Sequence, residues 1–203
     1  SKGHACLALY SCLVELGLIK PEEIQTFEKN ESRLLGHPVI NKEIGIEFST
    51  GSLGMGLSLG IGVALSFKNK KKENNVYVLL GDGECNEGSI WESAMSAVNF
   101  NHDNLICIID NNGFQQTGTN EQIMKNSNIA EKWKSFNWDV HEIDGHNINE
   151  IDNALSIVSN KPKLIVAKTI KGKGLKIAEE NNAWHHSMIS KQQYEDGVKD
   201  LNE

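Results

Sequence analysis

Val76-Tyr77-Val78-Leu79-Leu80-Gly81-Asp82-Gly83 is the stretch of sequence that decides the fold. Its first five residues are β-branched, aromatic or aliphatic, which is typical of a strand buried on both faces. A second such run, Leu105-Ile106-Cys107-Ile108-Ile109, ends at Asp110-Asn111-Asn112-Gly113. Between the two runs, Glu87–Phe100 reads as a helix, so the whole segment predicts a strand–helix–strand unit with parallel strands.

The same alternation continues downstream and predicts an α/β fold. We expect helices near Ile129–Phe136 and at Ile148–Ser159, and strands near Asp139–Ile143 and at Leu164–Lys168. The prediction is a single domain over residues 1–203, with three α/β/α layers in which helices cover both faces of a mostly parallel sheet. In such a sheet, ligands bind at the carboxyl ends of the strands.

Helical periodicity also precedes the first strand. It predicts helices at Ala5–Leu18, from Pro21 onward and at Leu57–Phe67. Near the third helix, small residues recur at every fourth position (Gly56, Gly60 and Ala64), so one face is nearly bare backbone. That face suits close packing, either inside the domain or against another chain.

Composition limits the class of protein. The hydrophobic fraction of 39% and charged fraction of 23% are ordinary for a globular chain, and the net charge of -7 argues against a nucleic-acid-binding surface. No apolar run approaches the roughly 20 residues that span a bilayer, so we expect a soluble, cytoplasmic protein. The start at Ser1 is neither a signal peptide nor an initiator Met, which indicates that the extreme N-terminus is lacking.

The cysteines and the last residues carry weaker signals. The four cysteines are scattered without a CxxC pair, so we interpret them as small buried hydrophobes in a reducing compartment. These are Cys6, Cys12, Cys85 and Cys107. The final stretch, Glu195–Glu203, is expected to be a charged tail.

Asp82 is the residue whose surroundings point to a metal ion. The flanking glycines let the backbone approach an anion closely, and the following helix offers free amide groups to a phosphate. A carboxylate at this place would repel the phosphate unless a cation lay between them. Asn112 ends the next buried strand 30 positions later, so both side chains are expected at one edge of the sheet. Their oxygens suit Mg²⁺ or Ca²⁺.

Together with Asn111-Asn112 at this distance, Gly81-Asp82-Gly83 resembles the thiamine diphosphate motif that several enzyme families share. Further motifs occur in the order seen in transketolases, and the resemblance covers nearly the whole chain. They are Ser1-Lys2-Gly3-His4-Ala5, Gly36-His37-Pro38, Ser49–Gly56, Trp91-Glu92 and Lys168–Gly174. Pyruvate-dehydrogenase-type α subunits share the metal motif but lack this histidine set, and deoxyxylulose phosphate synthase is a closer rival.

The resemblance implies roles for individual residues. The metal ligands would be Asp82, Asn112 and the main-chain carbonyl of Phe114. The cofactor would contact Gly51 and Leu53 beside its rings, and Gly81, Asp82, Gly83 and Asn112 around its diphosphate and metal. The catalytic set would be His4 and His185 near the reaction centre, His37 at the donor's hydroxyls, and Glu87 between paired sites.

Some of these positions have another interpretation. Glu87 is also explained as an acid at a helix N-terminus, where it interacts with the helix dipole. Lys171 and Lys173 are explained as solvated loop charges. Gln116 and Thr117 depart from the family's pattern, because relatives often have an aliphatic residue and an aspartate there, and both departures bear on the donor pocket.

The resemblance implies half of an enzyme, since no segment resembles the family's pyrimidine-binding domain. We expect the N-terminal subunit of a split transketolase, or a fragment of a longer chain, which transfers a two-carbon ketol unit from a ketose (phosphate) to an aldose (phosphate). Two copies would pair and each would dock a pyrimidine-binding partner, giving a heterotetramer. Alternatives are a carboligase of specialised sugar or secondary metabolism and a non-catalytic regulatory module. A dinucleotide-binding domain would need a G-x-G-x-x-G turn that is lacking.

Overall fold

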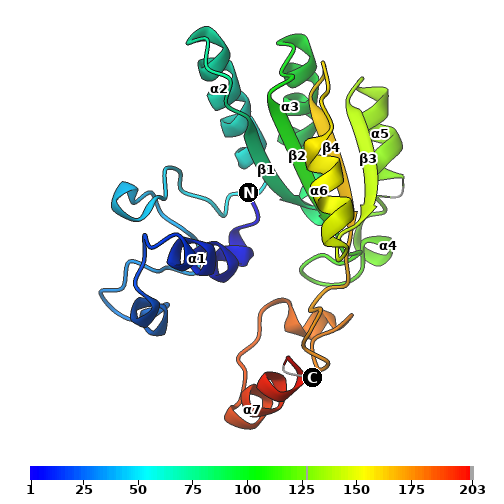
Figure 1. Ribbon diagram of the computed structural model, residues 1–203. Coiled ribbons are helices and arrows are strands. Elements are labelled where there is room, and N and C mark those ends of the chain that lie inside the picture. The colour runs from blue at the N-terminus through cyan, green and yellow to red at the C-terminus, as the bar shows by residue number, and fades with distance from the viewer. Residues whose placement is uncertain (127, 202–203) are drawn as a thin grey trace.

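The computed structural model describes residues 1–126 and 128–201 (Figure 1). Helices and strands alternate through its central part. The elements are α1 (Cys6–Glu15), α2 (Met55–Asn69), β1 (Val76–Gly81), α3 (Gly88–Asn99), β2 (Leu105–Asn111), α4 (Asn120–Ile123), α5 (Ile129–Ser135), β3 (Asp139–Asp144), α6 (Ile148–Ser156), β4 (Lys163–Lys168) and α7 (Lys191–Asp200). Short 3-10 helices lie at Gly3–Ala5, Pro21–Thr26, Lys42–Ile44, Gly83–Asn86 and Asn182–His185.

The strands form one parallel sheet in the order β1-β2-β4-β3, which confirms the predicted α/β fold. In the register of neighbouring strands, Gly81 lies opposite Asp110, and Asp110 lies opposite Ala167. The carboxyl ends of β1, β2 and β4 therefore meet at one edge, and this edge carries Asp82 and Asn112.

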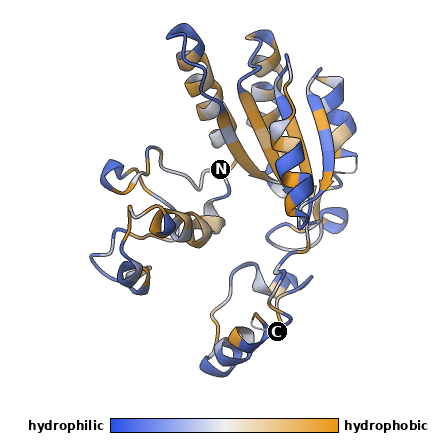
Figure 2. Cartoon of the chain, in the orientation of Figure 1, coloured by the Kyte–Doolittle hydropathy of each residue, from blue (hydrophilic) through white to orange (hydrophobic). Residues whose placement is uncertain are grey.

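Helices α2, α3 and α5 lie on one face of the sheet and α6 on the other (Figure 1). The first face holds the larger core, which includes Leu80, Cys107 and Trp133, and the second holds Ile106, Ala154 and Ile165. Figure 2 shows that β1, β2 and β4 are largely hydrophobic, whereas the edge strand β3 is mostly hydrophilic.

The face of the sheet that α6 covers is less completely covered by helices than the sequence predicted. In the described residues, α6 packs against the β3 and β4 side, while Tyr77 and Leu79 of β1 are 56% and 44% exposed. The three-layer arrangement is present, but its second layer consists of α6 and does not extend over β1.

The N-terminal segment has a small core of its own, built around α1. It contains Tyr10, whose hydroxyl donates to the main-chain oxygen of Leu35 at 2.6 Å. The buried members are Cys6, Tyr10, Leu13, Ile19, Leu34, Ile44 and Ile46. This core carries the loop with His37 toward the sheet edge.

The small-residue face of α2 packs inside the domain. A Cβ atom on Gly60 would lie 2.5 Å from Cγ2 of Val78 in β1, and Ala64 is fully buried. Helix α2 and strand β1 therefore approach as closely as glycine allows. The small-residue face packs inside the domain and not against another chain.

Two expectations from the sequence were wrong. The charged tail is instead mostly helix α7, which begins with a capping box between Ser190 and Gln193; the last two positions of the predicted tail, 202 and 203, lie outside the described residues. Cys12 is exposed, unlike the other three cysteines, which are buried. Among the described residues, none of the helices has the length and apolar character needed to cross a membrane.

Candidate functional site

Asp82 follows β1 directly and is only 2% exposed. One carboxylate oxygen, Oδ1, accepts from the Gly83 amide at 2.8 Å. The other, Oδ2, accepts from the Gly113 amide at 2.6 Å and from Nδ2 of Asn120 at 2.8 Å. Burial raises the pKa of the Asp82 carboxyl above its ordinary value despite these hydrogen bonds. A nearby cation would reverse that effect, because an opposite charge favours the ionised form.

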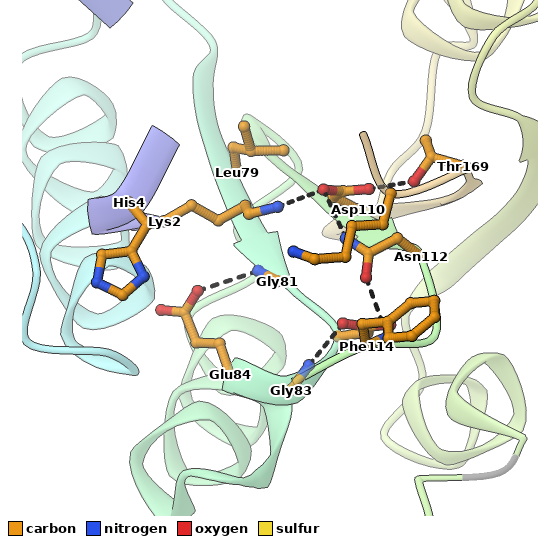
Figure 3. Close-up of polar contacts among 12 residues, drawn as sticks. Lys2, His4, Leu79, Gly81, Gly83, Glu84, Asp110, Asn112, Phe114 and Thr169 are labelled. Carbon is orange, nitrogen blue, oxygen red and sulfur yellow. Dashed lines mark hydrogen bonds and ion pairs between the residues drawn. The ribbon is translucent and has the colours of Figure 1, made fainter. Parts of the chain in front are cut away.

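Asn112 follows β2, on the neighbouring strand, and its side-chain amide is held at both ends. Oδ1 accepts from the Phe114 amide at 3.0 Å, and Nδ2 donates to Oδ2 of Asp110 at 3.2 Å. Figure 3 shows Asn112 between Asp110 and Phe114. Because an ionised carboxylate accepts only, Asp110 fixes which end of the amide points away from it.

These residues fit a divalent cation that is shared with a phosphate. The described part of the chain contains no group of three or more His, Cys, Asp or Glu side chains that could hold a metal. The expected ligand set needs only one carboxylate, Asp82, with neutral oxygens from Asn112 and Phe114. Hard oxygen ligands of this kind suit Mg²⁺ or Ca²⁺, and phosphate oxygens would supply further ligands.

Two lysines, Lys2 and Lys171, line the same cavity as the Asp110 carboxylate. Lys2 forms an ion pair with Asp110, which also accepts a hydrogen bond from the hydroxyl of Thr169 (Figure 3). Burial alone would raise the pKa of Asp110, but the Lys2 cation and these hydrogen bonds lower it below the ordinary value. Burial, together with the nearby Lys2, lowers the pKa of Lys171. The candidate site therefore places positive groups beside the sheet edge that carries Asp82 and Asn112.

A cavity of about 480 Å³ opens at this edge. Its polar end is lined by Lys2, Asp110, Asn112, Thr169 and Lys171, and its apolar part by residues such as Ile108 and Ile165. The sequence had given Lys2 no role of its own and explained Lys171 as a loop charge, yet Lys171 is half-buried here. The position of Lys2 inside the Ser1–Ala5 motif was the signal that could have identified it.

Three predicted histidines meet although they lie far apart in the sequence. The ring of His4 lies 5.1 Å from the ring of His37 and 5.1 Å from that of His185, centroid to centroid. Nδ1 of His4 and Nε2 of His185 are 3.1 Å apart, and Nζ of Lys171 is 3.4 Å from Nδ1 of His185. His186 lies farther from His4, with ring centroids 6.4 Å apart.

Two rings of the cluster, His4 and His185, are favoured in the neutral form. Burial and the Lys171 cation lower the pKa of His185 to about 4, and burial together with His37 lowers the pKa of His4. Near neutral pH the rings of His4 and His185 are therefore neutral, and each neutral imidazole has one nitrogen that donates a hydrogen bond and one that accepts.

Of the two residues predicted to contact the cofactor rings, Gly51 lies next to His37. Gly51 has a φ of +113°, and a Cβ atom there would lie 2.4 Å from Cδ2 of His37, so only glycine fits. Leu53 is 46% exposed. Glu87 is an exposed residue at the N-cap of α3, beside Gly54. This position is compatible with a contact between paired sites and with an acid that interacts with the helix dipole.

Glu84 is a site residue that the sequence analysis missed. It is 3% exposed, and its carboxylate accepts from the Gly54 amide at 2.8 Å and the Gly81 amide at 3.1 Å. It thereby ties the glycine-rich loop to the end of β1. Gly83, predicted to contact the diphosphate, is closely packed, since a Cβ atom there would lie 2.8 Å from Cγ of Gln115.

The comparisons with known proteins all match transketolases, and the matches cover nearly the whole chain. The family described as "Transketolase, thiamine diphosphate binding domain" matches residues 1–201. An apulose-4-phosphate transketolase subunit from Phocaeicola vulgatus is 41% identical over 206 residues, covering 100% of this chain and 73% of that protein. The 6-deoxy-6-sulfo-D-fructose transketolase subunit SqwG from a Clostridium species is 36% identical, covering 99% of this chain and 74% of that protein.

Solved structures give the same result for the fold. Transketolase from Campylobacter jejuni superposes with a TM-score of 0.90 at 28% identity, covering 98% of this chain but 33% of that one. The chain thus spans about three quarters of the two subunit relatives and about one third of this solved transketolase.

Proposed function

The chain belongs to the transketolase family, as its thiamine diphosphate-binding domain, and from this membership we propose that it is one half of a working carboligase. The reaction moves a two-carbon ketol unit from a ketose to an aldose. The observation that carries the proposal is the pairing of Asp82 and Asn112 at neighbouring strand ends, with Lys2, Lys171 and the histidine cluster around them. We propose that residues 1–203 act as a single diphosphate-binding domain.

Thiamine diphosphate, when bound, supplies the nucleophilic carbon for breaking and forming the C–C bond. The protein's part is to hold and orient it. We assign the divalent cation, Mg²⁺ or Ca²⁺, to Asp82, Asn112 and the Phe114 carbonyl. Lys2 and Lys171 are assigned to the negative charge of the diphosphate, because cationic side chains beside a metal–phosphate site lower its net charge.

The remaining residues act around the substrate. We assign His4, His37 and His185 to proton transfer and hydrogen bonding at the donor's hydroxyls, because their rings lie within a few ångströms of one another. Gly51 and Leu53 are assigned to the face of the cofactor rings. Glu87, at the exposed end of α3, is assigned to contact between paired sites.

A partner is part of the proposal. Two relatives are named as subunits of a transketolase, and this chain spans about a third of the length of a solved transketolase. We infer a cytoplasmic assembly in which two copies pair and each docks a pyrimidine-binding subunit or domain. Exposed apolar side chains at the glycine-rich loop and the start of α2 support a contact surface there, with Leu53 at 46%, Met55 at 47% and Leu59 at 38% exposure.

The sugars are proposed by class. The subunit relatives are named for apulose 4-phosphate and 6-deoxy-6-sulfo-D-fructose, which are sugars with a terminal anionic group. These names favour a carboligase acting on a specialised anionic sugar as the second candidate, beside ordinary ketose and aldose phosphates. A non-catalytic module is less well supported, because the expected metal ligands are all present.

Isothermal titration of thiamine diphosphate with Mg²⁺ tests the proposal. The chain would be titrated alone and together with a pyrimidine-binding partner candidate, each as wild type and as Asp82→Ala. Binding that requires both the metal and the partner, and that is lost in Asp82→Ala, is expected. The enzyme function would be excluded by an absence of binding under both conditions.

A further inference from the structure

Two asparagines in the segment after β2 bond to Asp82 from outside the proposed ligand set. Nδ2 of Asn120 donates to the carboxylate oxygen Oδ2 at 2.8 Å. Nδ2 of Asn126 donates to the main-chain oxygen of Asp82 at 3.3 Å. The first contact touches the group that would bind the metal, whereas the second touches only the backbone.

Asn120 is placed for this contact by its own backbone. It is the first residue of α4, whose capping box joins Thr119 and Gln122. The Asn120 amide donates to the main-chain oxygen of Gly113 at 2.9 Å, and the Gly113 amide in turn donates to Asp82. The side chain of Asn120 is therefore held over the carboxylate by a closed set of bonds.

The orientation of the Asn120 side chain has a cost. Its Oδ1 is buried and has no hydrogen-bond partner among the described residues. Turning the amide over would place that oxygen against the carboxylate of Asp82, where two acceptors would repel each other. A buried acceptor without a partner is unfavourable, so this orientation of the Asn120 amide is maintained against a penalty.

The two oxygens of the Asp82 carboxylate accept different numbers of hydrogen bonds. Oδ2 accepts two hydrogen bonds, from Gly113 and Asn120, while Oδ1 accepts one, from Gly83. A carboxylate offers about four lone-pair positions on its two oxygens. The donors on Oδ2 therefore leave Oδ1 as the oxygen with an open position for a cation.

We propose that Asn120 is a positioning residue of the metal site, whose amide holds Oδ2 of Asp82 so that Oδ1 stays available to the divalent cation. This rests on the proposed function and adds a residue that neither the metal motif nor the family resemblance assigned. Groups of this kind around a metal ligand set its orientation, and losing one typically lowers metal affinity by about 10- to 100-fold.

The experiment is a titration of Mn²⁺, followed by its paramagnetic resonance signal, on the assembly that binds thiamine diphosphate, with the cofactor saturating. Asn120→Ala is expected to weaken Mn²⁺ binding about tenfold or more. Asn126→Ala is the matched control, because it removes a bond to the same residue without touching the carboxylate, and its Mn²⁺ affinity is expected within about twofold of wild type.

A second measurement separates positioning from folding. The thermal midpoint of each metal-free variant is recorded, and turnover is measured over a range of Mg²⁺ concentrations. A positioning role predicts that high Mg²⁺ restores the kcat of Asn120→Ala at an unchanged thermal midpoint. If alanine lowers that midpoint, Asn120→Ser provides the second variant, since serine begins a helix well but its side chain is too short to carry the amide donor.

The outcomes are distinct. Unchanged Mn²⁺ affinity in Asn120→Ala, or an equal loss in Asn126→Ala, would overturn the role of Asn120 and leave the proposed function standing. If wild type binds no Mn²⁺ with thiamine diphosphate, or if Asp82→Ala binds as well as wild type, the proposed function itself fails.

Discussion

His185 illustrates how the surroundings of one residue decide its protonation. Its ring lies between His4 and Lys171, and burial together with these neighbours lowers its pKa to about 4 in the folded protein. A histidine in an unfolded chain has a pKa of about 6.5. Between these two values the unfolded state therefore binds more protons than the folded state.

This difference predicts a pH dependence of stability. The free energy of unfolding should fall as the pH drops from about 6.5 toward about 4, because protons then favour the unfolded chain. His185→Asn, which removes the group with the lowered pKa, should make this slope shallower. Urea denaturation at several pH values in this range measures the slope, and equal slopes in wild type and His185→Asn would contradict the assignment.

At this scale the sequence reached only part of the site. Asp82 and Asn112 could be predicted because each directly follows a buried strand and the spacing fits one crossover. The contacts of Asp110 could not, since its partners Lys2 and Thr169 lie 108 and 59 positions away. No periodicity in one sequence brings such residues together, and the same holds for Asn120, 38 positions from Asp82.

At the scale of elements, the glycines of α2 make contrasting predictions. Gly60→Ala would put a Cβ atom 2.5 Å from Val78, whereas a Cβ on Gly62 meets nothing within 4 Å. We expect Gly60→Ala to lower the free energy of unfolding by about 1–3 kcal/mol through overpacking. Gly62→Ala should raise it by up to about 1 kcal/mol, because alanine is the better helix former. Chemical denaturation of both variants checks this, and equal effects would refute the close approach of α2 and β1.

Lys163, at the start of β4, closes the C-terminal end of α6. It is 2% exposed, and its Nζ donates to the main-chain oxygens of Ala154, Leu155 and Ile157 at 2.8, 2.9 and 2.7 Å. Helices end with carbonyl groups that lack partners in the helix, and a cation there also interacts favourably with the dipole. One lysine thus fixes the position of α6 against the sheet.

Replacing this lysine should therefore destabilise the protein. Lys163→Met keeps the length of the side chain but leaves buried carbonyls without a donor, and we expect a loss of about 2–3 kcal/mol in the free energy of unfolding. Lys161→Met is the control, because Lys161 is exposed and its Nζ donates to the side chain of Asn137, and its effect should stay within about 0.5 kcal/mol. Thermal and urea unfolding would show the difference; a harmless Lys163→Met would mean that α6 needs no such cap.

Elements were more predictable than the site. The strands at Val76 and Leu105 and the helix between them follow from hydrophobic patterns within a few residues of their observed ends. Helix α7 was missed because its residues are mostly polar and give little apolar periodicity. Its capping box, Ser190 with Gln193, was the local signal that could have found it.

On the scale of the whole molecule, the site forms where three parts of the chain meet. The N-terminal segment brings His4 and His37, the sheet edge brings Asp82, and the segment after β4 brings Lys171 and His185. Figure 1 shows these segments on different sides of the sheet edge. A ligand that contacts all three parts would hold them together.

This arrangement predicts that the diphosphate stabilises the molecule as a whole. In the assembly with its pyrimidine-binding partner, thiamine diphosphate with Mg²⁺ should raise the thermal midpoint and slow tryptic cleavage at Lys171 and Lys173. A ligand at 100 times its Kd adds about 2.7 kcal/mol to the folded state. Thiamine, which lacks the diphosphate, is the control and should protect little. Equal protection by thiamine and thiamine diphosphate would show that Lys2, Lys171 and the proposed metal ligands do not bind the diphosphate.

The contact between His4 and His185 joins positions 181 residues apart, and this separation orders events while the protein is being translated. The first two strands, β1 and β2, can pair once residue 111 has left the ribosome, whereas β3 has no partner until β4 follows it. The histidine cluster must wait until residue 185 has emerged, which takes on the order of 10 to 40 seconds after His4 at usual rates of synthesis. A nascent chain can therefore pair β1 with β2 well before it possesses a site, and cofactor capture belongs to the period after translation has passed residue 185.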